Sequence, residues 1–131
     1  MVAPGDSVDR AVGPPPDTGL DRRERVRRRP EFLAAYERGR RLSGRLMTVF
    51  LLANGGEADR LGIAATRKYG NAVARNRAKR HVREAFRRNK PLAGLDIIVV
   101  PKREMRAADY ASIEADYRAI LNRRQRRTRE A

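Results

Sequence analysis

A strongly basic segment with helical periodicity dominates the middle of this chain. Residues 67–90 hold ten Lys or Arg against one acid, Glu84, and carry +9 of the chain's formal charge of +15. Every fourth position from Arg75 to Arg87 is Lys or Arg, so these side chains share one face of a helix. Like charges at this spacing destabilise an isolated helix. A solvated basic helix is the alternative, but the charge density and Asn76 between two arginines favour a phosphate-binding helix.

The composition narrows the class of protein. The 131 residues allow one domain of about 100 residues with tails. A net charge of +15 makes nucleic acid the first partner to consider and a membrane surface the second. No apolar run is long enough to span a membrane, and the basic helix lacks the large apolar face of a membrane-lying helix. The absence of Cys excludes disulfides and Cys-ligated zinc. We expect a cytoplasmic protein.

The two ends of the chain differ from its middle. Residues 1–24 are predicted to be a disordered extension, because the first 21 positions carry a net charge of −3, three consecutive prolines and few apolar groups. Residues 25–122 are predicted to form the folded domain. Residues 123–131 contain five arginines and are predicted to be a frayed basic tail.

Local patterns predict the first elements of the domain. A short helix is expected from Pro30, a favoured first-turn residue, to Gly39. Two apolar segments, Leu46–Leu52 and Leu61–Thr66, alternate in the manner of strands. The intervening Asn54-Gly55-Gly56 favours a turn, so an antiparallel hairpin is expected. One face of this hairpin is apolar, and the other could be a shallow groove floor with Phe50 as its aromatic residue.

The second half of the domain is expected to be helix, strand, helix. Asn71 is a good N-cap for the basic helix, which should end before Pro91. Ile97–Val100 is apolar throughout, as in a buried central strand. A final helix from about Asp109 places an apolar stripe toward the core. The expected fold is a two-layer α/β (α+β) sandwich, with helices packed on one small sheet.

The chain lacks the groups that a protein nuclease needs. It contains one histidine, His81, no Cys, no carboxylate pair at adjacent strand ends and no nucleotide-binding glycine loop. His81 is expected on the helix surface or partly packed. The residues therefore predict a nucleic-acid binder without chemistry of its own. Single-stranded RNA is favoured, because Phe32, Tyr36 and Phe50 could stack on bases, although core filling stays open for each.

The basic segment resembles the signature of the protein subunit of bacterial ribonuclease P. The matching positions are Lys68, Tyr69, Gly70, Asn71, Ala72, Val73, Arg75, Asn76, Arg77, Lys79, Arg80, Arg83, Glu84, Ala85, Phe86 and Arg87. The similarity extends upstream through Arg29–Phe32 and Tyr36–Gly39, and downstream through Asp96–Val100. It covers roughly residues 25–121.

This resemblance implies a ribonucleoprotein in which the RNA subunit, with Mg²⁺, cleaves precursor tRNA to form the mature 5′ end. It implies a small mixed sheet with a left-handed βαβ crossover and helices packed on the sheet. It also implies partners, namely the catalytic RNA and precursor tRNA, and neither a membrane nor a small-molecule substrate. The residues implied to face the catalytic RNA are Arg75, Asn76, Arg77 and Arg80. Those implied to touch the 5′ leader are Phe32, Tyr36, Phe50, Lys68, Lys79 and Arg83.

The chain departs from the family pattern at a few positions. His81 stands where the family usually has an aliphatic residue, and Thr66-Arg67 replaces the more usual Ser-Lys. The alternative from another class is a ribosomal or RNA-chaperone-type protein without a processing role, and a protein nuclease is a distant third. Faster 5′ cleavage by a ribonuclease P RNA at low Mg²⁺ would distinguish the first interpretation from the others.

Overall fold

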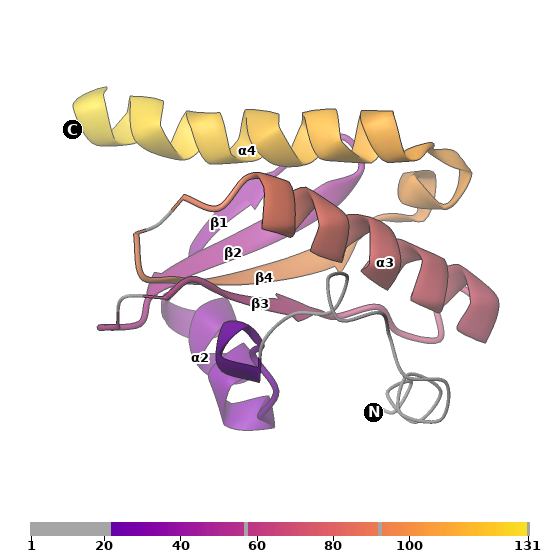
Figure 1. Ribbon diagram of the computed structural model, residues 1–131, viewed down its shortest axis with the longest axis horizontal. Coiled ribbons are helices and arrows are strands. Elements are labelled where there is room, and N and C mark those ends of the chain that lie inside the picture. The colour runs from indigo at the N-terminus through magenta and orange to yellow at the C-terminus, as the bar shows by residue number, and fades with distance from the viewer. Residues whose placement is uncertain (1–21, 57, 92, 131) are drawn as a thin grey trace.

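The computed structural model describes residues 22–56, 58–91 and 93–130, so the predicted extension lies outside the described residues up to position 21 (Figure 1). The elements are η1 (Arg22–Glu24), α2 (Arg29–Arg38), β1 (Arg40–Ser43), β2 (Met47–Ala53), β3 (Arg60–Ile63), α3 (Ala72–Arg88), β4 (Leu95–Pro101), η2 (Arg103–Ala107) and α4 (Tyr110–Glu130). Residues 22–24, predicted to belong to the disordered extension, form the 3₁₀ turn η1. The helix predicted from Pro30 to Gly39 is α2, and Gly39 is its C-cap.

The four strands form one mixed sheet in the order β1-β2-β4-β3. Antiparallel pairing joins β1 to β2 and β2 to β4, whereas β3 and β4 are parallel. The chain passes from β3 to β4 through α3, which makes a βαβ unit. The expected fold class, a small mixed sheet with helices packed on it, is confirmed.

The predicted hairpin between Leu46–Leu52 and Leu61–Thr66 is wrong, because β4 lies between β2 and β3 and pairs with both. Both faces of β4 are apolar and fully buried at Ile97, Ile98 and Val99, because β4 lies between two strands in a sheet with helices on both faces. The expected turn instead packs against the start of β4. The Asn54 amide donates to the Gly94 carbonyl at 2.9 Å.

Strand β1 was not predicted. Its four residues contain one apolar side chain, that of the buried Leu42, so no alternation marks it in the sequence. The hairpin of this sheet joins β1 to β2, and the Gly44 amide donates to the Met47 carbonyl at 2.8 Å. The structure therefore replaces the predicted hairpin with one between β1 and β2.

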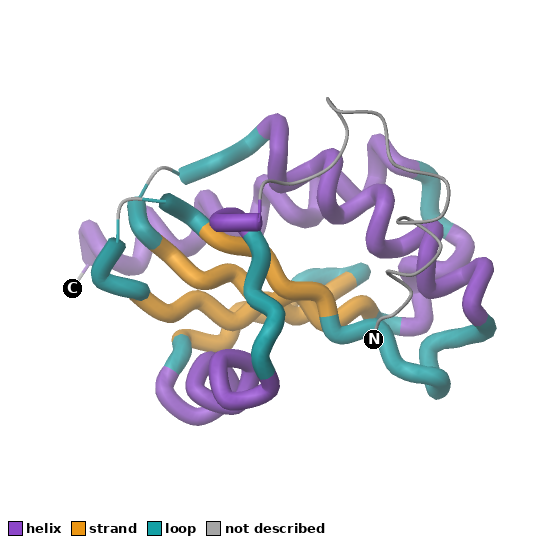
Figure 2. Tube along the Cα trace, turned by 60° about the horizontal axis from the view of Figure 1, so that its bottom comes forward, coloured by secondary structure: helices purple, strands orange, loops and turns teal. Residues whose placement is uncertain are grey.

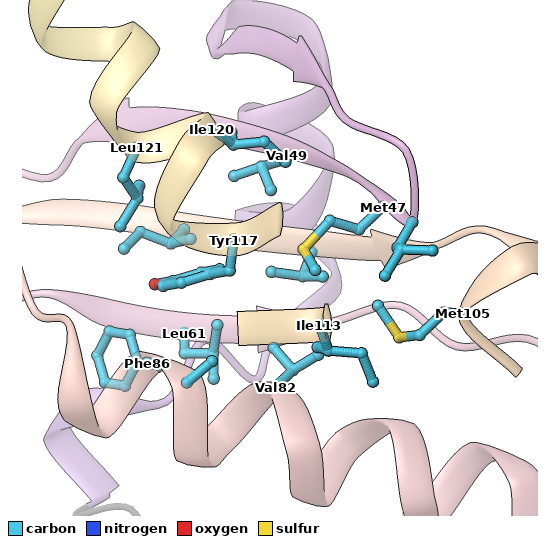
Figure 3. Packing of buried hydrophobic residues seen from close by; sticks show 14 of the residues in the cluster. Met47, Val49, Leu61, Val82, Phe86, Met105, Ile113, Tyr117, Ile120 and Leu121 are labelled. Carbon is cyan, nitrogen blue, oxygen red and sulfur yellow. The ribbon is translucent and has the colours of Figure 1, made fainter. Parts of the chain in front are cut away.

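Helices cover both faces of the sheet. Figure 2 shows α2 on the opposite side of the strands from α3 and α4. The main core lies on the α3 and α4 side, where Phe86 and Val82 of α3 meet Tyr117 and Ile113 of α4 (Figure 3). Its buried members include the predicted stripes Ala78, Val82, Ala85 and Phe86 of α3 and Ile113, Tyr117, Ile120 and Leu121 of α4. A smaller core lies under α2, with Val26, Ala35 and Ile98 buried and Phe32 and Phe50 packed against them.

Helix α4 continues to Glu130, so residues 123–130 are helical where a frayed tail was predicted. Two arginine contacts tie this part of the helix to the edge strand β1. Arg123 Nη2 donates to the Ser43 carbonyl at 2.6 Å, and Arg40 Nη1 donates to the Arg124 carbonyl at 3.3 Å. These contacts make residues 123 and 124 part of the folded domain.

Candidate nucleic-acid interface

The basic helix α3 begins at the predicted cap. The Asn71 Oδ1 atom accepts a hydrogen bond from the Ala74 amide at 2.9 Å. No acidic residue lies in the first turn, although an acid there would be favoured by the helix dipole. The start of α3 is therefore positive both in its side chains and in its backbone.

Arg75 and Arg77 are two positions apart in α3, so their side chains lie on opposite flanks of the helix and make different contacts. Arg75 Nη1 turns back to the Gly70 carbonyl at 2.8 Å. Arg77 donates to two carbonyls beyond β4, those of Ala108 at 2.9 Å and Arg106 at 3.4 Å. Arg77 therefore links α3 to η2 and the residue that follows it through hydrogen bonds, a structural role that sequence reasoning missed.

The outward face of α3, between the Arg75 and Arg77 flanks, carries the other two residues predicted to contact the RNA subunit. Arg80 is exposed and Asn76 is half-buried. Lys79 and Arg83 follow Arg75 at four-residue spacing on its flank, and both are half-buried. The face is thus a continuous polar surface in which Arg80 is the most open of these cations.

Positive charge is partly neutralised at the other end of α3. Glu84 accepts hydrogen bonds from Arg87 at 2.8 Å and from Arg88 at 2.7 Å. Hydrogen bonding by Arg87, followed by Arg88, lowers the pKa of Glu84 below its ordinary value. The charge available to a polyanion is therefore concentrated in the first part of the helix.

The three predicted aromatic residues come together on the α2 side of the sheet. The rings of Tyr36 and Phe50 meet edge-on with centroids 5.0 Å apart. Phe32 packs over Gly62 of β3, where a Cβ would lie 2.8 Å from its Cζ atom. Tyr36 is 37% exposed, and Phe32 and Phe50 are half-buried. Phe32 and Phe50 therefore pack against the small core, Tyr36 packs against Phe50, and all three keep a surface toward solvent.

A shallow hollow of about 330 Å³ lies beside these rings. It is lined by Arg27, Arg29, Phe32, Leu33 and Tyr36. Sequence reasoning missed Arg27, Arg29 and the exposed Leu33. Their only sequence signal is helical spacing, since Arg29, Leu33 and Tyr36 share one flank of α2. The lining combines ring faces with guanidinium groups, the pairing that single-stranded nucleic acid requires.

The remaining predicted leader contacts are not part of that hollow. Lys68 is exposed in the turn between β3 and α3, and Lys79 and Arg83 lie on α3, across the sheet from α2. None of the three is among the residues that line the hollow. The three aromatic rings thus lie together on the α2 side of the sheet, and these cations lie outside that group.

His81 is partly packed between α3 and α4, in agreement with one of the two expectations. Its ring meets that of Tyr110 at a centroid distance of 5.7 Å, and its buried Nδ1 has no hydrogen-bond partner among the described residues. Burial, and then the charges of Arg77 and Arg80, lower the pKa of His81, whereas Asp109 acts in the opposite direction. The lowered pKa favours the neutral imidazole, whose ring packs against Tyr110.

Metal-ligating clusters and membrane-spanning helices are both absent from the part of the chain that the structure describes. Within it, no three His, Asp or Glu side chains gather into a group that could hold a metal ion. None of its helices is long and apolar enough to cross a membrane.

Sequence comparison identifies similar proteins. A family described as Ribonuclease P matches residues 20–125. The ribonuclease P protein component of Desulfovibrio desulfuricans is 43% identical over 110 residues, covering 79% of this chain and 85% of that protein. The corresponding protein of Thermotoga maritima is 44% identical over 86 residues, covering 64% of this chain and 74% of that protein.

Solved structures agree with this similarity. The RNase P protein from Thermotoga maritima superposes with a TM-score of 0.70 at 37% identity, covering 76% of this chain and 96% of that one. The RNase P protein of Staphylococcus aureus gives a TM-score of 0.70 at 30% identity, covering 76% of this chain and 93% of that one.

Proposed function

The chain belongs to the ribonuclease P protein family, and on that premise we propose that it is the protein subunit of a cytoplasmic ribonucleoprotein that matures the 5′ ends of tRNA. The protein binds the catalytic RNA with α3 and the 5′ leader of precursor tRNA with the aromatic site under α2. The RNA subunit performs the cleavage.

The single observation that carries this proposal is the pairing of two different nucleic-acid surfaces on one small domain. The α3 surface is cationic, with Arg75, Arg77 and Arg80 around Asn76, and suits folded RNA with closely spaced phosphates. The α2 surface is aromatic, with the Tyr36 ring edge-on to the Phe50 ring, and suits unpaired bases. A protein that joins a catalytic RNA to a single-stranded leader needs both.

In this proposal Lys68, Lys79 and Arg83 guide the leader phosphates around the β3 edge toward the aromatic site. Their side chains can contact phosphate without base specificity. Arg27 and Arg29 add cations at the aromatic hollow itself. The protein thereby favours substrates that carry a leader.

Mg²⁺ is held by the RNA subunit and the substrate in this proposal. The described residues offer no carboxylate or imidazole cluster for it. The cationic surface of α3 instead neutralises RNA phosphates, and so it lowers the Mg²⁺ concentration that the assembled particle needs.

Reconstitution tests the proposal. A bacterial ribonuclease P RNA is mixed with precursor tRNA at low Mg²⁺, with and without the purified chain, and 5′ cleavage is followed. The chain should accelerate cleavage at the mature 5′ end, and the chain without RNA should leave the precursor intact. If the chain does not accelerate cleavage, the proposal is wrong and a ribosomal or RNA-chaperone role becomes the better interpretation. Specific cleavage by RNA-free protein would contradict catalysis by the RNA subunit.

A further inference from the structure

A second hollow, of about 570 Å³, lies between the start of α3 and η2, and we call it the α3–η2 hollow. It is lined by Tyr69, Asn71, Val73, Ala74, Arg77, Arg103, Glu104, Arg106 and Ala107. Its volume falls in the range of about 300–1,000 Å³ that ligand pockets occupy. It lies on the Arg77 flank of α3, whereas the aromatic hollow is formed by α2.

The hollow is strongly cationic. Three guanidinium groups, those of Arg77, Arg103 and Arg106, face one carboxylate, that of Glu104. Among the described residues, no ion pair joins Arg103 or Arg106 to an acid, and both are exposed. Arg77 is held in place by the Arg106 and Ala108 carbonyls. The other two arginines are therefore available to an anion.

Apolar groups line the other part of the hollow. Val73 is 76% exposed, although it stands beside the well-packed Ala74. The methyl group of Ala107 and the buried ring of Tyr69 complete this part. Tertiary packing gives no reason for an open valine here, but a flat apolar ligand would cover it.

Gly70 lies in the turn before α3, next to the Arg106 side chain that lines the hollow. A Cβ on Gly70 would lie 2.9 Å from the Ala74 Cβ and 3.6 Å from Arg106 Nε. The Ala74 distance is too short for a side chain at position 70, whereas the Arg106 distance is an ordinary contact, so the start of α3 requires the glycine and the Arg106 side chain lies beside it. Guanidinium groups and a small apolar surface then occur within one nucleotide-sized hollow.

We propose that the α3–η2 hollow binds one nucleotide of the catalytic RNA, with Arg103 and Arg106 on its phosphate and its base against Val73. This proposal rests on the proposed function, because it names further residues for the contact between α3 and the RNA subunit. Guanidinium groups suit phosphate because they donate two parallel hydrogen bonds. Arg77 acts as a positioning residue that holds η2 at the correct place.

The first test removes the two free arginines. Arg103→Ala with Arg106→Ala should weaken binding to a bacterial ribonuclease P RNA about a hundred-fold, since each charged contact contributes on the order of ten-fold. The slope of log K against log salt should become shallower by roughly 0.7–0.9 for each lost phosphate contact. The matched control is Arg45→Ala with Arg118→Ala, which removes two exposed arginines outside the hollow.

The second test adds a charge without harming the helix. Val73 is the second residue of α3, where an acid interacts favourably with the helix dipole, so Val73→Asp should keep or raise the melting temperature. It should nevertheless reduce RNA affinity by about ten-fold or more, through repulsion of the phosphate. Ala111→Asp is the matched control, because Ala111 is the exposed second residue of α4.

The outcomes separate this inference from the function on which it rests. Wild-type chain that does not bind the RNA overturns both. If wild-type binds and each variant equals its control, the hollow is not an RNA site. When enough variant protein is added to saturate the ribonuclease P RNA, the affinity of the assembled particle for precursor tRNA should equal that of the wild-type particle within about two-fold. A loss confined to that step would assign the hollow to the substrate and overturn the inference.

Discussion

The ring of Tyr36 on α2 meets the ring of Phe50 on β2 edge-on, with centroids 5.0 Å apart and planes inclined at 71°. This contact lies where α2 crosses the sheet, beside the hollow that Arg29 and Leu33 help to line. Because α2 and β2 are joined through the short strand β1, the two rings come from one continuous segment of the chain. Their contact packs α2 against the sheet, and in the proposed function the same two rings offer a surface to bases.

Replacing Tyr36 with Ala should weaken binding of leader-bearing precursor tRNA by about 1–3 kcal/mol, because a stacking surface is lost. Mature tRNA, which has no leader, should bind as before. Tyr36→Phe keeps the ring and serves as the control. Affinities for both tRNA forms are measured beside the melting temperature. Equal losses for both forms, with a large fall in stability, would instead identify Tyr36 as a core residue.

Arg80 and Arg77 should respond differently to replacement by Ala. Arg80 is exposed, so Arg80→Ala should change stability by less than about 0.5 kcal/mol. Its RNA affinity should fall by about 1.5–3 kcal/mol if Arg80 contacts phosphate. Arg77→Ala should lower both affinity and stability, because the Ala108 carbonyl loses its donor. Urea unfolding and filter binding report the two quantities. Equal stabilities of the two variants would contradict the fastening role of Arg77.

The titration of His81 should make the stability of the protein depend on pH. Its pKa is lowered in the folded protein by burial first and then by Arg77 and Arg80. The unfolded chain therefore takes up the proton first, and stability is lost as the pH falls below about 6.5, the ordinary His value. His81→Ile removes this contribution, so its melting temperature should fall less between about pH 7.5 and 5.5. Equal falls in melting temperature for the wild type and His81→Ile would show that His81 does not contribute to the pH dependence of stability.

Gly62 should not tolerate a side chain. A Cβ there would lie 2.8 Å from Phe32 Cζ, 2.9 Å from Ile98 Cδ1 and 3.0 Å from Val26 Cβ. Gly62→Ala should therefore cost about 1–3 kcal/mol of stability by overpacking, and it should displace Phe32 from its place in the proposed leader site. Gly56→Ala is the control, because among the described residues its Cβ would meet Asn54 Oδ1 alone, at 3.3 Å. Thermal unfolding of both variants checks this, and equal melting temperatures would contradict the close approach of α2 to β3.

The sequence by itself determined the elements whose signals are local. Asn71 as a cap, Gly39 as a terminator and the apolar stripe of α3 depend on neighbours within one or two turns, so their periodicity and chemistry identified them correctly. The cationic face of α3 followed from the same four-residue spacing. The sequence could name the aromatic residues as candidates, but only the fold shows that they lie together on one face of the sheet.

The tertiary structure alone decided which strands pair and what the arginines contact. Alternation tells which face of a strand is apolar, but not which strand lies beside it, so the insertion of β4 between β2 and β3 had no local signal. Arg77 reaches a carbonyl 31 positions away, and Arg103 and Arg106 join it only because β4 returns the chain to the start of α3. Such contacts depend on the packing of the whole domain. Neighbouring residues cannot encode them, because one arginine in sequence looks the same whether it faces solvent, a carbonyl or a phosphate.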